Sequence, residues 1–249
     1  LIRISTDFAT FKRQTDTNNT QAELACRLVL RGLKEGKTYS QGSKTDVAAY
    51  LTRAKEQLSV KDYLAPMVGD SSKLEWVIED MSFSASEFGK WLLKGGPEPN
   101  PRGGKMNCWE AVLFGAYKAG AASESWLRDM YPRWLRAETE KEVGGASLRF
   151  DHEERYFHLD SFFEREIAAS EVYHYSPKDT YPKLPLAGDV TMFGSATGHT
   201  ALATGTRTNE GVPEMLSLWN EPDNKKFLQK VTHDDLGKSG FSFFSPKWR

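Results

Sequence analysis

Apolar residues recur every three to four positions through much of the first 170 residues, which is the period of an amphipathic helix. The helices predicted from this pattern span about 21–35, 44–58, 74–81, 84–95, 124–141 and 154–170. The fourth begins at an apparent capping box, Ser84-Ala-Ser-Glu87, and ends at Gly95. The N-terminal hundred residues are therefore expected to form a helical subdomain.

From about Pro182 onward the apolar period changes to the alternation of strands. The predicted strands span 186–193, 198–205, 214–219 and 227–231, followed by a short turn or helix over 232–236. Short loops between them favour an antiparallel meander. Helices come first and strands last, which predicts the α+β class.

A Pro- and Gly-rich stretch, Gly95–Gly104, is the clearest break in the chain and predicts either a domain boundary or one wall of a cleft. We expect a helical N-terminal subdomain over 1–96. A second domain is expected over 97–249, with a helical insertion at about 123–175.

The stretch Gly103–Gly120 places Cys108 at the start of an amphipathic helix. The positive end of a helix macrodipole favours thiolate over thiol, as a cysteine nucleophile requires. The same helix face carries Val112, Gly115, Ala116 and Ala119. These small or apolar residues predict close packing against a sheet.

His199 opens a strand between two glycines, 91 positions after Cys108. Ala201 and Ala203 share its face and are small, which matches the small face of the cysteine helix. Packing of this strand on the helix would bring imidazole and thiol together, forming the pair of nucleophilic cysteine catalysis.

A third group is expected to orient the imidazole, and the next strand offers Ser217 or Asn220. Leu216, Leu218 and Asn220 share one parity along this strand. If the leucines face the core under the helix, Asn220 ends that face, so Asn220 is the predicted third residue and Ser217 the alternative. Asn220 equally fits a turn residue that stops the strand before Pro222.

Charge and composition narrow the function classes. The chain has 33 basic and 34 acidic residues, so no basic surplus points to nucleic acid. No apolar run approaches the roughly 20 residues that span a bilayer, and no signal peptide is visible. The two cysteines, Cys26 and Cys108, are too few for a disulfide framework or a four-cysteine zinc site, and Cys26 fits a buried helix position.

No cofactor or metal is expected. His152 and His158 are six positions apart, so they do not stack on one helix face as paired zinc ligands would. No phosphate-binding glycine loop and no dinucleotide fingerprint occurs in the sequence.

Three motifs carry a family resemblance: Asn107-Cys-Trp-Glu110, Pro185-Leu-Ala-Gly-Asp189-Val and Gly198-His-Thr-Ala-Leu-Ala-Thr-Gly205. A cysteine opening a helix, Gly-Asp before a strand and Gly-His opening a strand resemble the papain-like fold. The version with Gly-Asp-Val before the histidine strand is most similar to NlpC-type cell-wall peptidases and related amidases. The resemblance implies a cysteine-bearing helix packed on an antiparallel sheet.

It also implies a cysteine hydrolase that cleaves an amide or isopeptide bond through Cys108 and His199. The helical N-terminal part and long helical insertion are similar to bacterial toxin or effector domains that use this fold. The expected substrate is a peptide, peptidoglycan or a protein, the expected location is secreted or delivered from a bacterium, and an immunity or chaperone protein is a further suggested partner. A deamidase or acyltransferase acting on a host protein, and a non-catalytic binding or adaptor module, are the alternatives.

Overall fold

The computed structural model describes residues 19–34, 44–77, 86–143, 146–149, 162–169, 172–175, 184–193, 199–220, 222, 224–236 and 241–249. Its helices are α2 (Asn19–Lys34), α3 (Lys44–Leu64), α4 (Glu87–Lys94), α5 (Cys108–Lys118) and α6 (Glu124–Thr139), with short turns η1 (Ala65–Met67) and η2 (Asp234–Leu236). Residues 162–167 are also helical, as expected for the described part of the helix predicted over 154–170. Its strands are β1 (Glu75–Trp76), β2 (Lys105–Met106), β3 (Glu140–Val143), β4 (Ala146–Arg149), β5 (Tyr173–His174), β6 (Val190–Phe193), β7 (His199–Arg207), β8 (Pro213–Leu218), β9 (Leu228–Thr232) and β10 (Ser242–Phe244). The predicted α+β class is confirmed.

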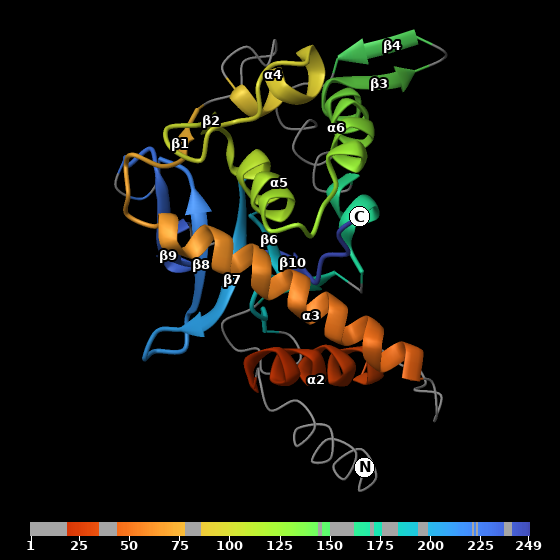
Figure 1. The fold of residues 1–249 in the computed structure, drawn as a ribbon, viewed down its shortest axis with the longest axis vertical. Coiled ribbons are helices and arrows are strands. Elements are labelled where there is room, and N and C mark those ends of the chain that lie inside the picture. Colours follow the sequence, from red (N-terminus) through yellow and green to blue (C-terminus); the bar gives the residue numbers. More distant parts are fainter. Residues whose placement is uncertain are drawn as a thin grey trace, which may run out of the picture.

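A six-stranded antiparallel sheet forms the centre of the described fold, in the order β5-β10-β6-β7-β8-β9. The predicted meander is confirmed as β6 to β9. The short strands β5 and β10, which extend one edge of the sheet, were not predicted. Helices α3 and α5 lie across one face of the sheet (Figure 1).

Alternation along the strands divides the apolar residues of the sheet between two cores. The core shared with α3 and α5 takes Val190, Met192, Leu202, Leu216 and Leu218. The core on the opposite face takes Phe193, Ala201, Met215, Val231 and Phe243. The sheet is therefore buried on both faces near its centre.

Helix α5 is buried along most of its length, from Cys108 to Ala116. Its close approach to α3 depends on Gly115, because a Cβ there would lie 2.9 Å from the Leu64 side chain. Gly115, which we predicted to face the sheet, therefore contacts α3 instead.

Most of the predicted helices are present. Helices α2 and α3 confirm the first two, and α3 continues six residues beyond the expected end at residue 58, to Leu64. The helix expected over 74–81 is wrong for its described part, since Glu75 and Trp76 form a strand paired with β2. Residues 78–81 lie outside the described ranges.

Helix α4 starts later than predicted. Its N-cap is Ser86, whose Oγ accepts the Gly89 N–H, so the capping box predicted at 84–87 is wrong. Its end is as predicted, at Gly95 in the left-handed conformation (φ 66°).

The N-terminal helices are not packed as a separate unit. Residues of α3 and α4 belong to the same core as α5 and the sheet. Helix α2 is tied to the sheet by a buried ion pair, with Arg31 Nη2 3.0 Å from Asp189 Oδ2. A division at residue 96 therefore does not separate two cores in the described chain.

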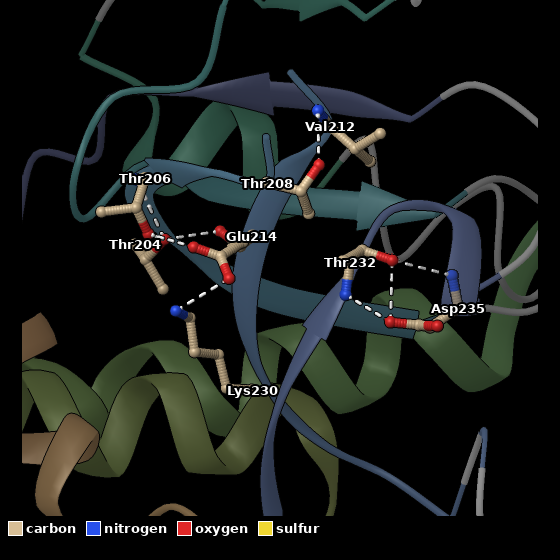
Figure 2. A network of polar contacts seen from close by, with 8 residues as sticks. All are labelled: Thr204, Thr206, Thr208, Val212, Glu214, Lys230, Thr232 and Asp235. Atoms are coloured by element: carbon tan, nitrogen blue, oxygen red, sulfur yellow. Dashed lines mark hydrogen bonds and ion pairs between the residues drawn. The ribbon is translucent and has the colours of Figure 1, made fainter. Parts of the chain in front are cut away.

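The end of the sheet farthest from His199 carries an exposed polar network (Figure 2). Glu214 on β8 accepts a hydrogen bond from Thr206 Oγ1 at 2.6 Å and pairs with Lys230 Nζ at 2.8 Å. Thr204 Oγ1 donates to the Glu214 carbonyl at 2.8 Å. These bonds join β7, β8 and β9 where the β7–β8 hairpin leaves the core.

Glu214→Gln is expected to lower the free energy of unfolding at neutral pH by roughly 0.2–1 kcal/mol, as for other surface pairs. The hydrogen bonds from Lys230 and Thr206 hold the pKa of Glu214 below its usual range. The stabilisation is therefore present above the unfolded-state pKa and is lost as the pH falls through the folded-state pKa. The free energies of unfolding of the wild type and Glu214→Gln, measured by urea titration, should therefore converge at acid pH. In a Lys230→Gln background, Glu214→Gln should cost less; equal costs would show that the pair is not coupled.

Candidate functional site

Cys108 is the first residue of α5, and the residue is 7% exposed. The helix start is fixed by a capping box: Asn107 Oδ1 accepts the Glu110 N–H at 2.8 Å, and Glu110 Oε2 accepts the Asn107 N–H at 2.9 Å. Both Cys26 and Cys108 are thiols. The predicted position of Cys108 at a helix N-terminus is confirmed.

The Glu110 carboxyl also reaches two other helices. Its Oε2 accepts from Ser86 Oγ, the N-cap of α4, at 2.6 Å, and its Oε1 accepts from the Tyr131 hydroxyl of α6. The side chain is completely buried. Burial raises the pKa of Glu110, and the hydrogen bonds from Ser86, Tyr131 and Asn107 oppose that rise. Glu110 was not among the predicted site residues, although Asn-x-x-Glu before an apolar run is the pattern of a capping box.

His199 is the first residue of β7 and is buried, with 1% of its surface exposed. Its Nε2 lies 2.9 Å from Ser217 Oγ, and its ring stacks on Trp219 with centroids 4.4 Å apart and an angle of 17°. Its Nδ1 has no hydrogen-bond partner in the described chain. If Nε2 carries the proton and donates to Ser217, Nδ1 is an unprotonated acceptor.

The face that His199 occupies differs from the prediction. Strand pairing sets Phe193 opposite His199 and Leu202 opposite Leu216. His199 thus shares a face with Ala201, in the core away from α5, whereas Leu202 points to the helix side. The predicted packing of the His199 and Ala201 face on the cysteine helix is therefore wrong, and Nδ1 makes no hydrogen bond to Cys108.

The third residue follows from the same parity. Leu216 and Leu218 belong to the core shared with α5, as expected. Because His199 lies on the other face, its partner is Ser217, the alternative, and not Asn220. Asn220 lies in a bend after β8 and is partly exposed.

Cys108 and His199 nevertheless lie at the same end of the sheet. Helix α5 follows β2, which pairs with β1. Trp76 N of β1 donates to the Lys226 carbonyl at 2.8 Å, just before β9. The first residue of β9, Leu228, pairs with the last residue of β8, Leu218, and the antiparallel pairing of Leu216 with Leu202 places Leu218 next to the start of β7.

The described part of the chain shows no cluster of three or more side chains suited to a metal ion. His152 and His158 lie outside the described residues. Among the helices that the structure describes, none combines the length and apolar character needed to cross a bilayer.

His199 should make the free energy of unfolding depend on pH below about 6.5. Burial lowers its pKa from 6.5 to about 3, so the unfolded chain binds a proton in this interval that the folded protein does not. The folded state is thus favoured above pH 6.5 and loses this advantage as the pH falls toward 3. His199→Gln should flatten the unfolding free energy across that range, measured by urea titration at several pH values. His174→Gln, at an exposed position on β5, is the control. An unchanged slope in His199→Gln would contradict the buried, neutral imidazole.

Comparison of the chain with protein-family models, with curated proteins and with solved structures found no match.

Proposed function

We propose that this protein is a papain-like cysteine hydrolase of the NlpC type, which cleaves an amide or isopeptide bond with Cys108 as nucleophile and His199 as base. One observation carries the proposal. A histidine at the same end of the sheet as a helix-opening cysteine has one ring nitrogen held by Ser217 and the other without a partner. A catalytic imidazole needs such an arrangement, with one nitrogen for orientation and one for proton transfer.

The proposal requires His199 to turn toward the thiol from the sheet face that it occupies. His199 is the first residue of β7, so it lies at the end of that strand, although it is buried there beside Phe193 and Trp219. Leaving the buried stack on Trp219 would return its pKa from about 3 toward 6.5. A pKa near the working pH is what a general base requires.

The chemistry then proceeds in two steps. His199 takes the thiol proton, the sulfur adds to the substrate carbonyl, and the proton passes to the leaving amine as its bond to the carbonyl carbon breaks. Water, activated by His199, then adds to the thioester and releases the acid and the free thiol. The Cys108 N–H, in the first turn of α5, is the proposed donor to the oxyanion.

The motif resemblance supports a peptide, peptidoglycan or protein substrate and a role as a bacterial toxin or effector domain. If an amine replaces water in the second step, the same thioester gives acyl transfer. If the bond broken is a side-chain amide of a protein, the reaction is deamidation. Both remain alternatives within the same mechanism.

The test is to express the wild type and Cys108→Ala in the bacterial periplasm and, separately, in the cytosol of a eukaryotic cell. Cell lysis by the wild type in the periplasm alone supports a cell-wall substrate, and an effect in the eukaryotic cytosol alone supports a host protein. Cys26→Ala, the other thiol, is the matched control and should behave as wild type. Equal behaviour of wild type and Cys108→Ala in both compartments would exclude catalysis by this thiol.

A non-catalytic binding module is the second candidate, favoured by the placement of His199 on the sheet face away from α5. Thiol reactivity separates the two. Alkylation of Cys108 by iodoacetamide should have its midpoint well below pH 8 in a hydrolase. A midpoint near that of an ordinary thiol, about 8.5, would favour the binding module.

A further inference from the structure

We propose that Glu110 is the positioning residue of the Cys108 site, holding the first turn of α5 in place through its bonds to α4 and α6. This inference rests on the proposed function, since it assigns a role in presenting the nucleophile. Three helices converge on this one buried carboxyl.

A capping box by itself needs Asn107 and Glu110 alone, and both of its bonds are present. The additional donors come from outside α5. Ser86 Oγ accepts the Gly89 N–H at 2.9 Å while donating to Glu110, so one hydroxyl caps α4 and binds the start of α5. Tyr131 reaches the same carboxyl from the middle of α6.

The packing around the carboxyl leaves little freedom. Ser86 and Glu110 are 1% and 0% exposed, and Phe88 packs edge-on against Tyr131 with ring centroids 5.5 Å apart. The tilt of the first turn of α5 is therefore set by α4 and α6 through the Glu110 carboxyl. Cys108 lies in that turn, between the two members of the capping box.

This placement matters for chemistry because the thiol and its proposed oxyanion donor, the Cys108 N–H, belong to the same turn. A displacement of about 1 Å at a reacting group can reduce a rate by about a hundredfold. The thiol also depends on its alignment with the helix terminus for stabilisation of the thiolate. Besides Glu110, two ionisable side chains bear on any pH dependence of this site. They are Tyr131, which donates a hydrogen bond to Glu110, and Cys108 itself, which lies in the same turn.

The test compares Glu110→Gln with Glu110→Met in a Cys26→Ala background, so that Cys108 is the sole thiol. Both replacements are uncharged and similar in length, but the amide oxygen of Gln is a good hydrogen-bond acceptor for the Asn107 N–H, whereas the thioether of Met is only a weak one. The rate of alkylation of Cys108 by iodoacetamide is measured against pH. We expect the midpoint in Glu110→Met to lie about 0.5 pH unit above that in Glu110→Gln, the size of a helix-terminus effect.

Two control variants separate the positioning effect from a general loss of stability. Met215→Ala loosens the core on the opposite sheet face and should lower Tm without moving the midpoint. Tyr131→Phe removes one donor, keeps both capping-box bonds and should raise the midpoint by a smaller amount. If Glu110→Met does not fold, the alkylation midpoint of Tyr131→Phe is compared instead with that of the Cys26→Ala parent, which retains Tyr131. Equal midpoints in the two Glu110 variants, no shift in Tyr131→Phe when that comparison is used, or an equal shift in Met215→Ala would overturn the proposal.

The outcome is independent of the hydrolase test, because alkylation requires no substrate. Loss of toxicity in Cys108→Ala without a difference between the two Glu110 variants would keep the hydrolase and remove the positioning role. A difference in midpoints without any effect of Cys108→Ala on cells would do the reverse: Glu110 would position a thiol that performs no hydrolysis.

Discussion

Arg31→Ala is expected to lower the free energy of unfolding by about 3–5 kcal/mol, the cost of leaving a buried charge without its partner. Arg31 and Asp189 are 1% and 0% exposed, and their charged groups are 3.0 Å apart. The Asp189 carboxylate also accepts from Gln57 at 3.0 Å and from Ser245 at 2.9 Å. Those neutral donors remain in the variant, but the compensating positive charge is gone. Urea denaturation at pH 7 measures the loss.

Matched variants separate the buried charge from the loss of side-chain volume. Arg27→Ala, on the same helix, removes an exposed i,i+4 pair with Glu23 and should cost less than about 0.5 kcal/mol. Arg31→Met combined with Asp189→Asn, which removes both charges and keeps an acceptor for Gln57 and Ser245, should recover part of the loss. A cost for Arg31→Ala no larger than that for Arg27→Ala would show that the pair does not hold α2 to the sheet.

Gly188→Ala is expected to cost roughly 3 kcal/mol or more, from two separate sources. The residue has φ of +78°, where an L side chain adds about 1–2 kcal/mol of backbone strain. An added Cβ would also lie 2.5 Å from the Gln57 carbonyl oxygen, so α3 and the entry to β6 must move apart. Overpacking of this kind adds about 1–3 kcal/mol. The loss is measured as a shift in the urea midpoint.

Gly69→Ala isolates the first source. Gly69 has a similar φ of +74°, but nothing lies within 4 Å of the position that its Cβ would take. Its cost should be the backbone strain alone. If the two variants cost the same, the close approach of α3 to Gly188 contributes nothing to stability.

The elements that sequence reasoning found are those whose signal is local. Strands β6 to β9 alternate in polarity and end at turn residues, and α2 and α3 repeat with the helical period. The extended segment at Glu75 has no such signal. It is a strand because Gly104, Lys226 and Met106 lie beside it and take its backbone hydrogen bonds, and all three are distant or unpatterned in sequence.

In the candidate site, too, the local sequence pattern did not report which elements pack together. Alternation correctly grouped Leu216 with Leu218 and separated both from Ser217. Alternation could not tell which face of β7 the helix covers, because neighbouring residues Ala201 and Leu202 are both apolar, and both faces of the strand are in fact buried. Small size suggested that Ala201 faced α5, whereas the space under the helix is filled by Leu202. Polar partners far apart in sequence, such as Arg31 and Asp189, leave no local trace at all.

The partners of the Asp189 carboxylate have a consequence for the order of folding. The Arg31 partner precedes it by 158 positions, and the Ser245 partner follows it by 56. Helix α2 is synthesised well before the groups that hold it through Arg31. Closing such a long loop is slow, whereas the apolar side chains Leu24 and Leu28 pack against the neighbouring helix α3, which a short stretch of chain joins to α2. During synthesis α2 can therefore pair with α3 while Arg31 stays in water, and burial of the Arg31 charge waits until both Asp189 and Ser245 have emerged.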